Sequence, residues 1–227
     1  MPAPRWHVHP DAGAALDAAA AQVLAAAAAA IPARGAFRIV LCGGETPRRL
    51  YARLAGAASD WVRWHVYWGD ERCVPRGDAL RNDAMAEAVW LAASPIPRAQ
   101  VHPVPAELGP EPGAQAYSSL LEDLPAFDLV LLGLGEDGHT ASLFPGRAWG
   151  GEGGPAALPV HDAPKPPPER VSLSAPRLGA SRDVIVLAFG DGKREAIRRW
   201  RAGESLPIAA IRPLQALQVH VDAAAAG

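Results

Sequence analysis

The chain of 227 residues has only two cysteines, Cys42 and Cys73, and no Cys-x-x-Cys pair. We therefore expect neither a disulfide framework nor a cysteine-based zinc site. We expect instead two reduced, buried thiols in a cytoplasmic protein. Long runs of one charge are also missing: 22 basic and 24 acidic residues are mixed along the chain, and the formal charge is −2. We therefore expect no nucleic-acid partner and no binding to a membrane surface.

The chain also lacks a strongly apolar run of the roughly twenty residues that a membrane span needs. Its nearest approach is the alanine-rich segment 18–33, which contains one leucine and follows Asp11 and Asp17. Alanine favours helix and aspartate is a good N-cap. We predict a helix of the mature protein from Asp11 to about residue 30, ended by the segment 32–35.

Two common motifs are absent. No Gly-Lys-Ser/Thr follows a glycine turn at the Walker spacing, and no Gly-x-Ser-x-Gly elbow of a serine esterase occurs. Gly133, Gly135 and Gly138 do match the dinucleotide spacing Gly-x-Gly-x-x-Gly. However, Pro145 and Gly146 end any helix within two turns, and a Gly/Pro-rich loop follows where a second strand is required. Dinucleotide binding is therefore disfavoured.

The same glycine turn is the most informative stretch that the chain does contain. It follows the apolar run 127–132, which is typical of a strand buried on both faces. Ligands bind at the carboxyl ends of strands in open α/β sheets. Asp137 and His139 lie at this strand end, so the sequence predicts a functional site here.

Strand-like and helix-like patterns alternate along the whole chain, which predicts one three-layer α/β domain over residues 1–227 with a mostly parallel central sheet. The other predicted strands are 5–9, 37–41, 64–68, 171–174, 184–189, 208–211 and 217–221. The other predicted helices begin near Arg48 or cover 81–91, 115–124 and 194–201, and residues 147–168 are predicted to be loop.

A glycine turn also follows the strand 37–41. Gly43 and Gly44 allow several backbone N–H groups to converge, Thr46 offers a hydroxyl, and Pro47 suits the first helical position. This arrangement indicates a phosphate-binding turn, and a tight strand-to-helix turn without a ligand is the alternative.

Charged residues follow the other strands. Asp70 and Glu71 should point to opposite sides of an extended chain, so at most one faces the cleft, and Arg72 is available for an oxyanion or a phosphate. A solvated turn is the alternative.

Three further cations are placed to reach the same cleft. The proline run after Lys165 is stiff and could hold Lys165 or Arg170 over it, and Lys193 follows the strand 184–189.

His7 and His9 would share one face of the strand 5–9 and could bind a metal, but no third ligand is apparent. We therefore expect no metal site.

Four blocks, taken together and in order, resemble the 6-phosphogluconolactonase family: Cys42-Gly-Gly-Glu-Thr-Pro47, Asp70-Glu-Arg-Cys-Val-Pro75, the stretch from Gly133 to Pro145, and the stretch from Lys165 to Leu173. The resemblance implies a Rossmann-like fold shared with glucosamine-6-phosphate deaminases and ribose-5-phosphate isomerases, and hydrolysis of a sugar-phosphate lactone without metal or cofactor. Glu45 and Arg81 depart from the serines that are usual in the family.

Lactone hydrolysis needs a general base for water and a positive group for the oxyanion. His139 is the candidate base, and Asp137 either orients it or caps a short following helix. In a rival deaminase or isomerase, Asp70 would move a proton on carbon, but residues 140–144 lack the further acid of the deaminases. A non-catalytic sugar-phosphate sensor is the second rival. We expect a monomer in the cytoplasm.

Overall fold

The computed structural model describes residues 3–227, which form two β-sheets and the helices around them. The central sheet has six parallel strands in the order β1-β9-β8-β5-β2-β3. Its strands are β1 (Arg5–His9), β2 (Phe37–Leu41), β3 (Trp64–Trp68), β5 (Phe127–Gly133), β8 (Ser181–Ala188) and β9 (Ala216–Asp222). β5 lies in the middle and is buried from Phe127 to Leu132, as its apolar sequence predicted.

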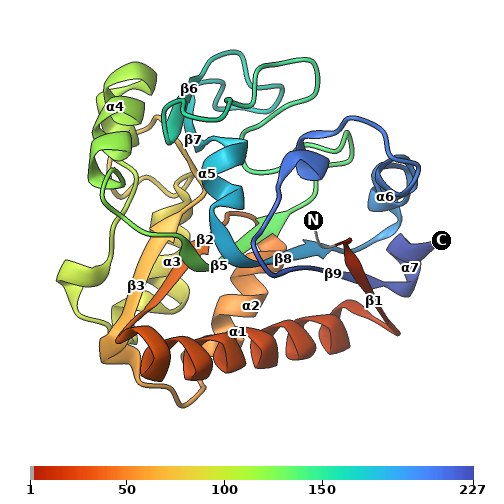
Figure 1. The fold of residues 1–227 in the computed structure, drawn as a ribbon, viewed down its shortest axis with the longest axis horizontal. Coiled ribbons are helices and arrows are strands. Elements are labelled where there is room, and N and C mark those ends of the chain that lie inside the picture. The colour runs from red at the N-terminus through yellow and green to blue at the C-terminus, as the bar shows by residue number, and fades with distance from the viewer. Residues whose placement is uncertain (1–2) are drawn as a thin grey trace.

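Helices cover both faces of this sheet. Figure 1 shows α1 along one side of the central strands and α5 and α6 on the other. The predicted α/β class with a mostly parallel central sheet is confirmed. The helices are α1 (Ala12–Arg34), α2 (Glu45–Ala55), α3 (Asn82–Val89), α4 (Pro110–Leu120), α5 (Ala175–Gly179), α6 (Arg194–Arg201) and α7 (Ala223–Ala226).

The long helix α1 has one buried face, made of residues spaced three or four apart from Ala15 to Ala30. By length and composition alone it could cross a membrane, yet this face packs against the central sheet. Asp11 caps it by accepting a hydrogen bond from the Ala14 N–H. The predicted end was wrong: the helix passes through Pro32 and stops at Gly35, whose N–H donates to the Ile31 carbonyl. A proline so near the end costs one hydrogen bond and leaves the last turn intact.

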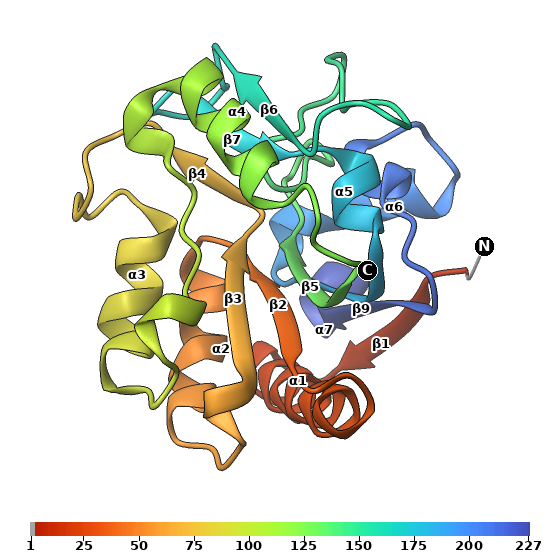
Figure 2. The ribbon, with the colours of Figure 1, turned by 60° about the vertical axis from the view of Figure 1, so that its left-hand side comes forward.

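A second sheet, which the sequence did not predict, lies beside the carboxyl ends of the central strands. It is antiparallel, in the order β4-β7-β6, with β4 (Asp70–Arg72), β6 (Ala157–Val160) and β7 (Arg170–Leu173). Figure 2 shows β4 continuing from β3 and β7 lying next to it. Residues 157–160 were predicted to be loop because the whole segment 147–168 is rich in glycine and proline, and Pro159 lies within the strand. β6 is an edge strand, where a proline removes no ladder hydrogen bond.

Two predicted helix starts and one predicted strand also need correction. α2 begins at Glu45 rather than near Arg48, and α4 begins at Pro110 rather than at residue 115. Prolines fit the first turn of a helix, where N–H groups have no intrahelical partner. Residues 208–211 are not a strand, because Pro207 starts a short 3-10 helix there (Pro207–Ala210).

Candidate active site

A cavity of about 200 Å³ lies where the carboxyl ends of β2, β5 and β8 meet β4 and the segment before β7. Eight of the residues that the sequence proposed line it: Gly43, Gly44, Asp70, Arg72, His139, Lys165, Arg170 and Lys193. Asp137 does not line the cavity but contacts His139. Thr46 is not among the lining residues, since it lies in the first turn of α2. The fold thus brings four separate strand ends to one site.

His139 and Asp137 form a hydrogen-bonded pair at the end of β5. The Asp137 carboxylate oxygen Oδ1 accepts from the His139 Nδ1–H at 2.6 Å and from the His139 backbone N–H at 3.1 Å. Because a carboxylate only accepts, Nδ1 carries a proton, and in the neutral imidazole the free lone pair is therefore on Nε2. Burial raises the pKa of Asp137, but the hydrogen bonds and charge of His139 outweigh this effect and hold it below its usual value.

The glycine turn allows this pair to form. A Cβ on Gly135 would lie 2.0 Å from the His139 Nδ1 and 2.7 Å from the Asp137 Oδ1, so a side chain there would displace both. No helix follows His139, since residues 140–146 form turns and an isolated bridge. The alternative role of Asp137 as the cap of a following helix is therefore wrong, and its contacts orient His139 instead.

Asp70 and Glu71 point in opposite directions, as the alternation of an extended chain requires. Asp70 is 6% exposed and faces the cavity, where its carboxylate accepts from the Ser142 hydroxyl at 2.6 Å and from the Asn82 amide at 3.3 Å. Glu71 is fully buried and accepts from the backbone N–H groups of Arg72, Asn82 and Asp83. Burial raises the pKa of Glu71 to about 7, while these three donors act in the opposite direction.

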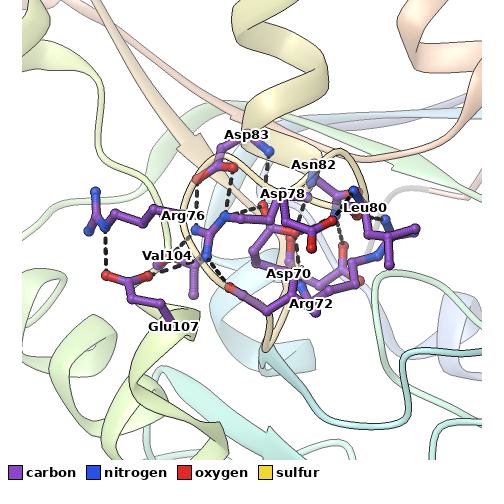
Figure 3. A network of polar contacts seen from close by, with 12 residues as sticks. Asp70, Arg72, Arg76, Asp78, Leu80, Asn82, Asp83, Val104 and Glu107 are labelled. Atoms are coloured by element: carbon purple, nitrogen blue, oxygen red, sulfur yellow. Dashed lines mark hydrogen bonds and ion pairs between the residues drawn. The ribbon is translucent and has the colours of Figure 1, made fainter.

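A buried arginine, Arg81, supports this part of the site. Its side chain is fully buried and bonds to Asp83 at 2.7 Å, to Glu107 at 3.2 Å and to the Val104 carbonyl at 2.9 Å. Figure 3 shows Asp83, Glu107 and Val104 in one network of polar contacts with Asn82 and Asp70. The sequence marked Arg81 only as a departure from the family pattern. Of its two hydrogen-bonded ionic partners, Asp83 is two residues away and Glu107 is distant in sequence.

Sequence reasoning also missed Asn82 and Ser142. Asn82 lines the cavity and donates from its amide to the Asp70 carbonyl at 2.9 Å. Its position in the first turn of the predicted helix 81–91 was the one available indication. Ser142 lies in a turn whose sequence gives no sign of its contact with Asp70.

The turn after β2 brings the backbone of Gly43 and Gly44 to the cavity. Gly44 has a φ of 109° and is the N-cap of α2, and the first N–H groups of a helix have no intrahelical partner. Pro47 stands in the third position of α2 rather than the first, as a consequence of the earlier start. The turn keeps the geometry of an anion-binding helix start.

The cavity carries an excess of positive charge. Arg72, Lys165, Arg170 and Lys193 line it, and Asp70 is the one acidic side chain among its lining residues in the described chain. Arg72 donates to the Leu80 carbonyl, and its buried Nε finds no partner within residues 3–227. The pKa of Lys193 is lowered, chiefly by burial. Nearby Glu136 acts in the opposite direction, and Lys165 lowers the pKa further. Such an arrangement suits a ligand that brings negative charge.

His7 and His9 lie on the edge strand β1 and do not line this cavity. His7 contacts Gln218 at 2.7 Å, and His9 contacts His220 at 3.0 Å with their rings stacked. Within the described chain, no three His, Cys, Asp or Glu side chains are grouped as metal ligands.

The chain was compared with known families and structures. A family model described as glucosamine-6-phosphate isomerases/6-phosphogluconolactonase matches residues 10–220. A 6-phosphogluconolactonase of Streptomyces coelicolor is 38% identical over 218 residues, which covers 88% of this chain and 84% of that protein. One of Synechocystis sp. is 40% identical over 192 residues, which covers 78% of this chain and 77% of that protein. The structure of 6-phosphogluconolactonase from Trypanosoma brucei matches with a TM-score of 0.90 at 27% identity, covering 100% of this chain and 98% of that chain.

Proposed function

The chain belongs to the glucosamine-6-phosphate isomerase/6-phosphogluconolactonase family, and we propose that it hydrolyses 6-phospho-D-glucono-1,5-lactone to 6-phospho-D-gluconate in the oxidative pentose phosphate pathway. The observation that carries the assignment of the base is the 2.6 Å pair between Asp137 and the His139 Nδ1 at a cation-lined cavity.

In this proposal His139 activates water. Its Nε2 takes a proton from the water as the oxygen attacks the lactone carbonyl, and the Asp137 carboxylate stabilises the imidazolium that forms. The carbonyl oxygen becomes an oxyanion, which the cavity cations stabilise. The ring C–O bond then breaks, the ring oxygen takes the proton from His139, and the carboxylic acid product ionises. No covalent nucleophile and no metal take part.

The phosphate serves as the handle that positions the lactone. It is remote from the bond that breaks, so the energy of binding it can place the carbonyl near His139. The helix start at Gly43 and Gly44 and the four cations Arg72, Lys165, Arg170 and Lys193 are proposed to supply this binding. Unphosphorylated gluconolactone should then be a poor substrate.

The rival deaminase or isomerase is less well supported. Both oxygens of the Asp70 carboxylate already accept hydrogen bonds, from Ser142 and Asn82, which leaves this group poorly placed to remove a proton from carbon. The turn 140–144 also contains no acid.

The deciding experiment supplies fresh 6-phosphogluconolactone and glucosamine 6-phosphate in separate assays and follows the release of acid and of ammonia. We expect acid from the lactone and no ammonia from the amino sugar. His139→Gln should lose about 10²- to 10⁴-fold in turnover while binding 6-phosphogluconate nearly as before. Ammonia release would support the deaminase, and near-normal turnover of the variant, corrected for spontaneous opening, would contradict the role of His139. Binding without turnover in the unsubstituted protein would favour the sensor.

We also propose that the chain is one domain that works as a monomer in the cytoplasm, without nucleic-acid or membrane partners. Buried apolar side chains of both sheets belong to one hydrophobic cluster, which supports a single domain. Sedimentation velocity would test the monomer.

A further inference from the structure

The segment that carries Lys165 has few backbone N–H groups that could donate hydrogen bonds to the rest of the chain. Four of its residues, 164 and 166–168, are prolines, which have no N–H to donate. Within the run 164–168 only Lys165 has a backbone N–H, so carbonyl groups supply most of the possible backbone contacts. The Pro168 carbonyl accepts from the Ala163 N–H at 3.0 Å, and the carbonyls of Lys165 and Pro167 need donors from elsewhere. Lys165 itself is exposed at the rim of the cavity.

Arg170 supplies these donors. Its Nε–H donates to the Pro167 carbonyl at 3.0 Å, and an Nη2–H donates to the Lys165 carbonyl at 2.6 Å. The side chain is 6% exposed, and its guanidinium lies 5.9 Å from the centre of the Phe144 ring. Two of the three nitrogens of this group are thus committed to the backbone of the proline segment.

Ser142 fixes the third nitrogen. Arg170 donates from Nη1 to the Ser142 oxygen at 3.4 Å, and Ser142 in turn donates its hydroxyl hydrogen to the Asp70 carboxylate at 2.6 Å. Asp70 is itself held by Asn82. On one side, the Arg170 guanidinium is therefore held by Ser142 and, through it, by Asp70. On the other side it holds the proline segment.

We infer that Arg170 is a positioning residue, which acts through Lys165 rather than as a phosphate ligand of its own. The planar fork of arginine can bond to two carbonyls at fixed spacing, and the single ammonium of a lysine cannot reproduce this geometry. This inference rests on the proposed function only in taking a sugar phosphate as the ligand of Lys165. It replaces the direct phosphate contact that the sequence and the proposed function gave Arg170 with an indirect role.

A double-mutant cycle tests this inference. Lys165→Met should raise the KM for the lactone and the Kd for 6-phosphogluconate by about 10- to 100-fold, the range for losing one hydrogen bond to a charged group. Arg170→Met should have a similar effect, and the double variant should be no more than about twofold worse than Lys165→Met alone. If the two effects multiply, Arg170 binds the ligand itself and the inference is wrong.

Arg170→Lys separates charge from geometry. It keeps the positive charge and loses the fork, so it should behave like Arg170→Met. Recovery close to the unsubstituted protein would overturn the inference. If Arg170→Met does not fold, as judged by thermal unfolding, the cycle is completed with Arg170→Lys instead.

Arg147 offers a matched control. It also holds two carbonyls of the preceding loop, those of His161 and Asp162 at 2.7 and 2.9 Å, but it does not line the cavity. Arg147→Met should change KM and Kd by less than about twofold. A loss of affinity as large as that of Arg170→Met would mean that general loosening of the loop explains both variants, and would contradict the inference. The Kd is measured by calorimetry with 6-phosphogluconate, so the cycle remains readable even if lactone hydrolysis is not observed.

Discussion

Replacing Gly43 by alanine should damage the site through a collision with Asn82. Gly43 does not have a positive φ, so its backbone conformation does not demand glycine. A Cβ there, however, would lie 1.8 Å from the Asn82 Oδ1 and 2.4 Å from its Cγ. Ordinary contacts begin near 3.4 Å, so the Asn82 amide would have to move by about 1.6 Å.

That displacement breaks the hydrogen bonds from the Asn82 amide to Asp70, at 2.9 Å to its carbonyl and at 3.3 Å to its carboxylate. Each is worth about 0.5–1.5 kcal/mol net, so the free energy of unfolding should fall by roughly 1–3 kcal/mol. Movement of about 1 Å at an active site can cost on the order of 100-fold in rate, and we expect kcat/KM to fall by about 10- to 100-fold.

Gly133→Ala is the matched control, because Gly133 lines the same cavity and its Cβ would meet nothing within 4 Å. Lactone opening is followed by acid release, and stability by denaturant unfolding. Equal behaviour of Gly43→Ala and Gly133→Ala in both assays would refute the collision argument.

Four further predictions concern the base, metal dependence, acid stability and the buried arginine. Asp137→Asn should lower turnover by about 5- to 30-fold, because a charge-assisted hydrogen bond is lost from a half-exposed carboxylate, and it should have no further effect in a His139→Gln background. Exhaustive chelation should leave activity unchanged, and a loss restored by zinc would contradict the metal-free mechanism. Burial, with the nearby histidines, lowers the pKa of His220 to about 4 from an ordinary 6.5. The unfolded chain therefore binds more protons between these values, and stability present above pH 6.5 should be lost as the pH falls to 4, by up to about 3 kcal/mol. His220→Gln should flatten this part of the stability profile, and an unchanged slope between pH 4 and 6.5 would contradict the argument. Arg81→Met should lower the free energy of unfolding by about 3–5 kcal/mol, since it leaves buried carboxylates without their cation, and a change under 1 kcal/mol would contradict this.

The central sheet could be predicted because its signals are local. Residues 127–132 form a continuous apolar run, and a strand buried on both faces needs no partner to be recognised. The same holds for the strands 37–41 and 64–68, whose bounds agree with the structure. His139 could be singled out because the glycine turn in front of it is itself visible in the sequence.

Helix ends were predicted less well because prolines were taken as boundaries. Pro32 lies inside α1, and Pro110 opens α4. In both places the proline falls where its missing N–H costs little, a fact that depends on where the helix starts and stops.

The sequence by itself determined the parallel strands, the glycine turns and the choice of His139 as the proposed base, since these follow from short-range patterns of apolar and glycine residues. Tertiary structure alone decided the second sheet, which pairs β4 with β7 across about a hundred residues and brings Arg72 opposite Arg170. It also decided that Arg81 is buried among acids and that Arg170 holds the proline segment. The β4–β7 pairing and the Arg81–Glu107 contact join residues far apart in the chain. Even between near neighbours, a side chain's partners are fixed only once the backbone has placed them within hydrogen-bonding distance.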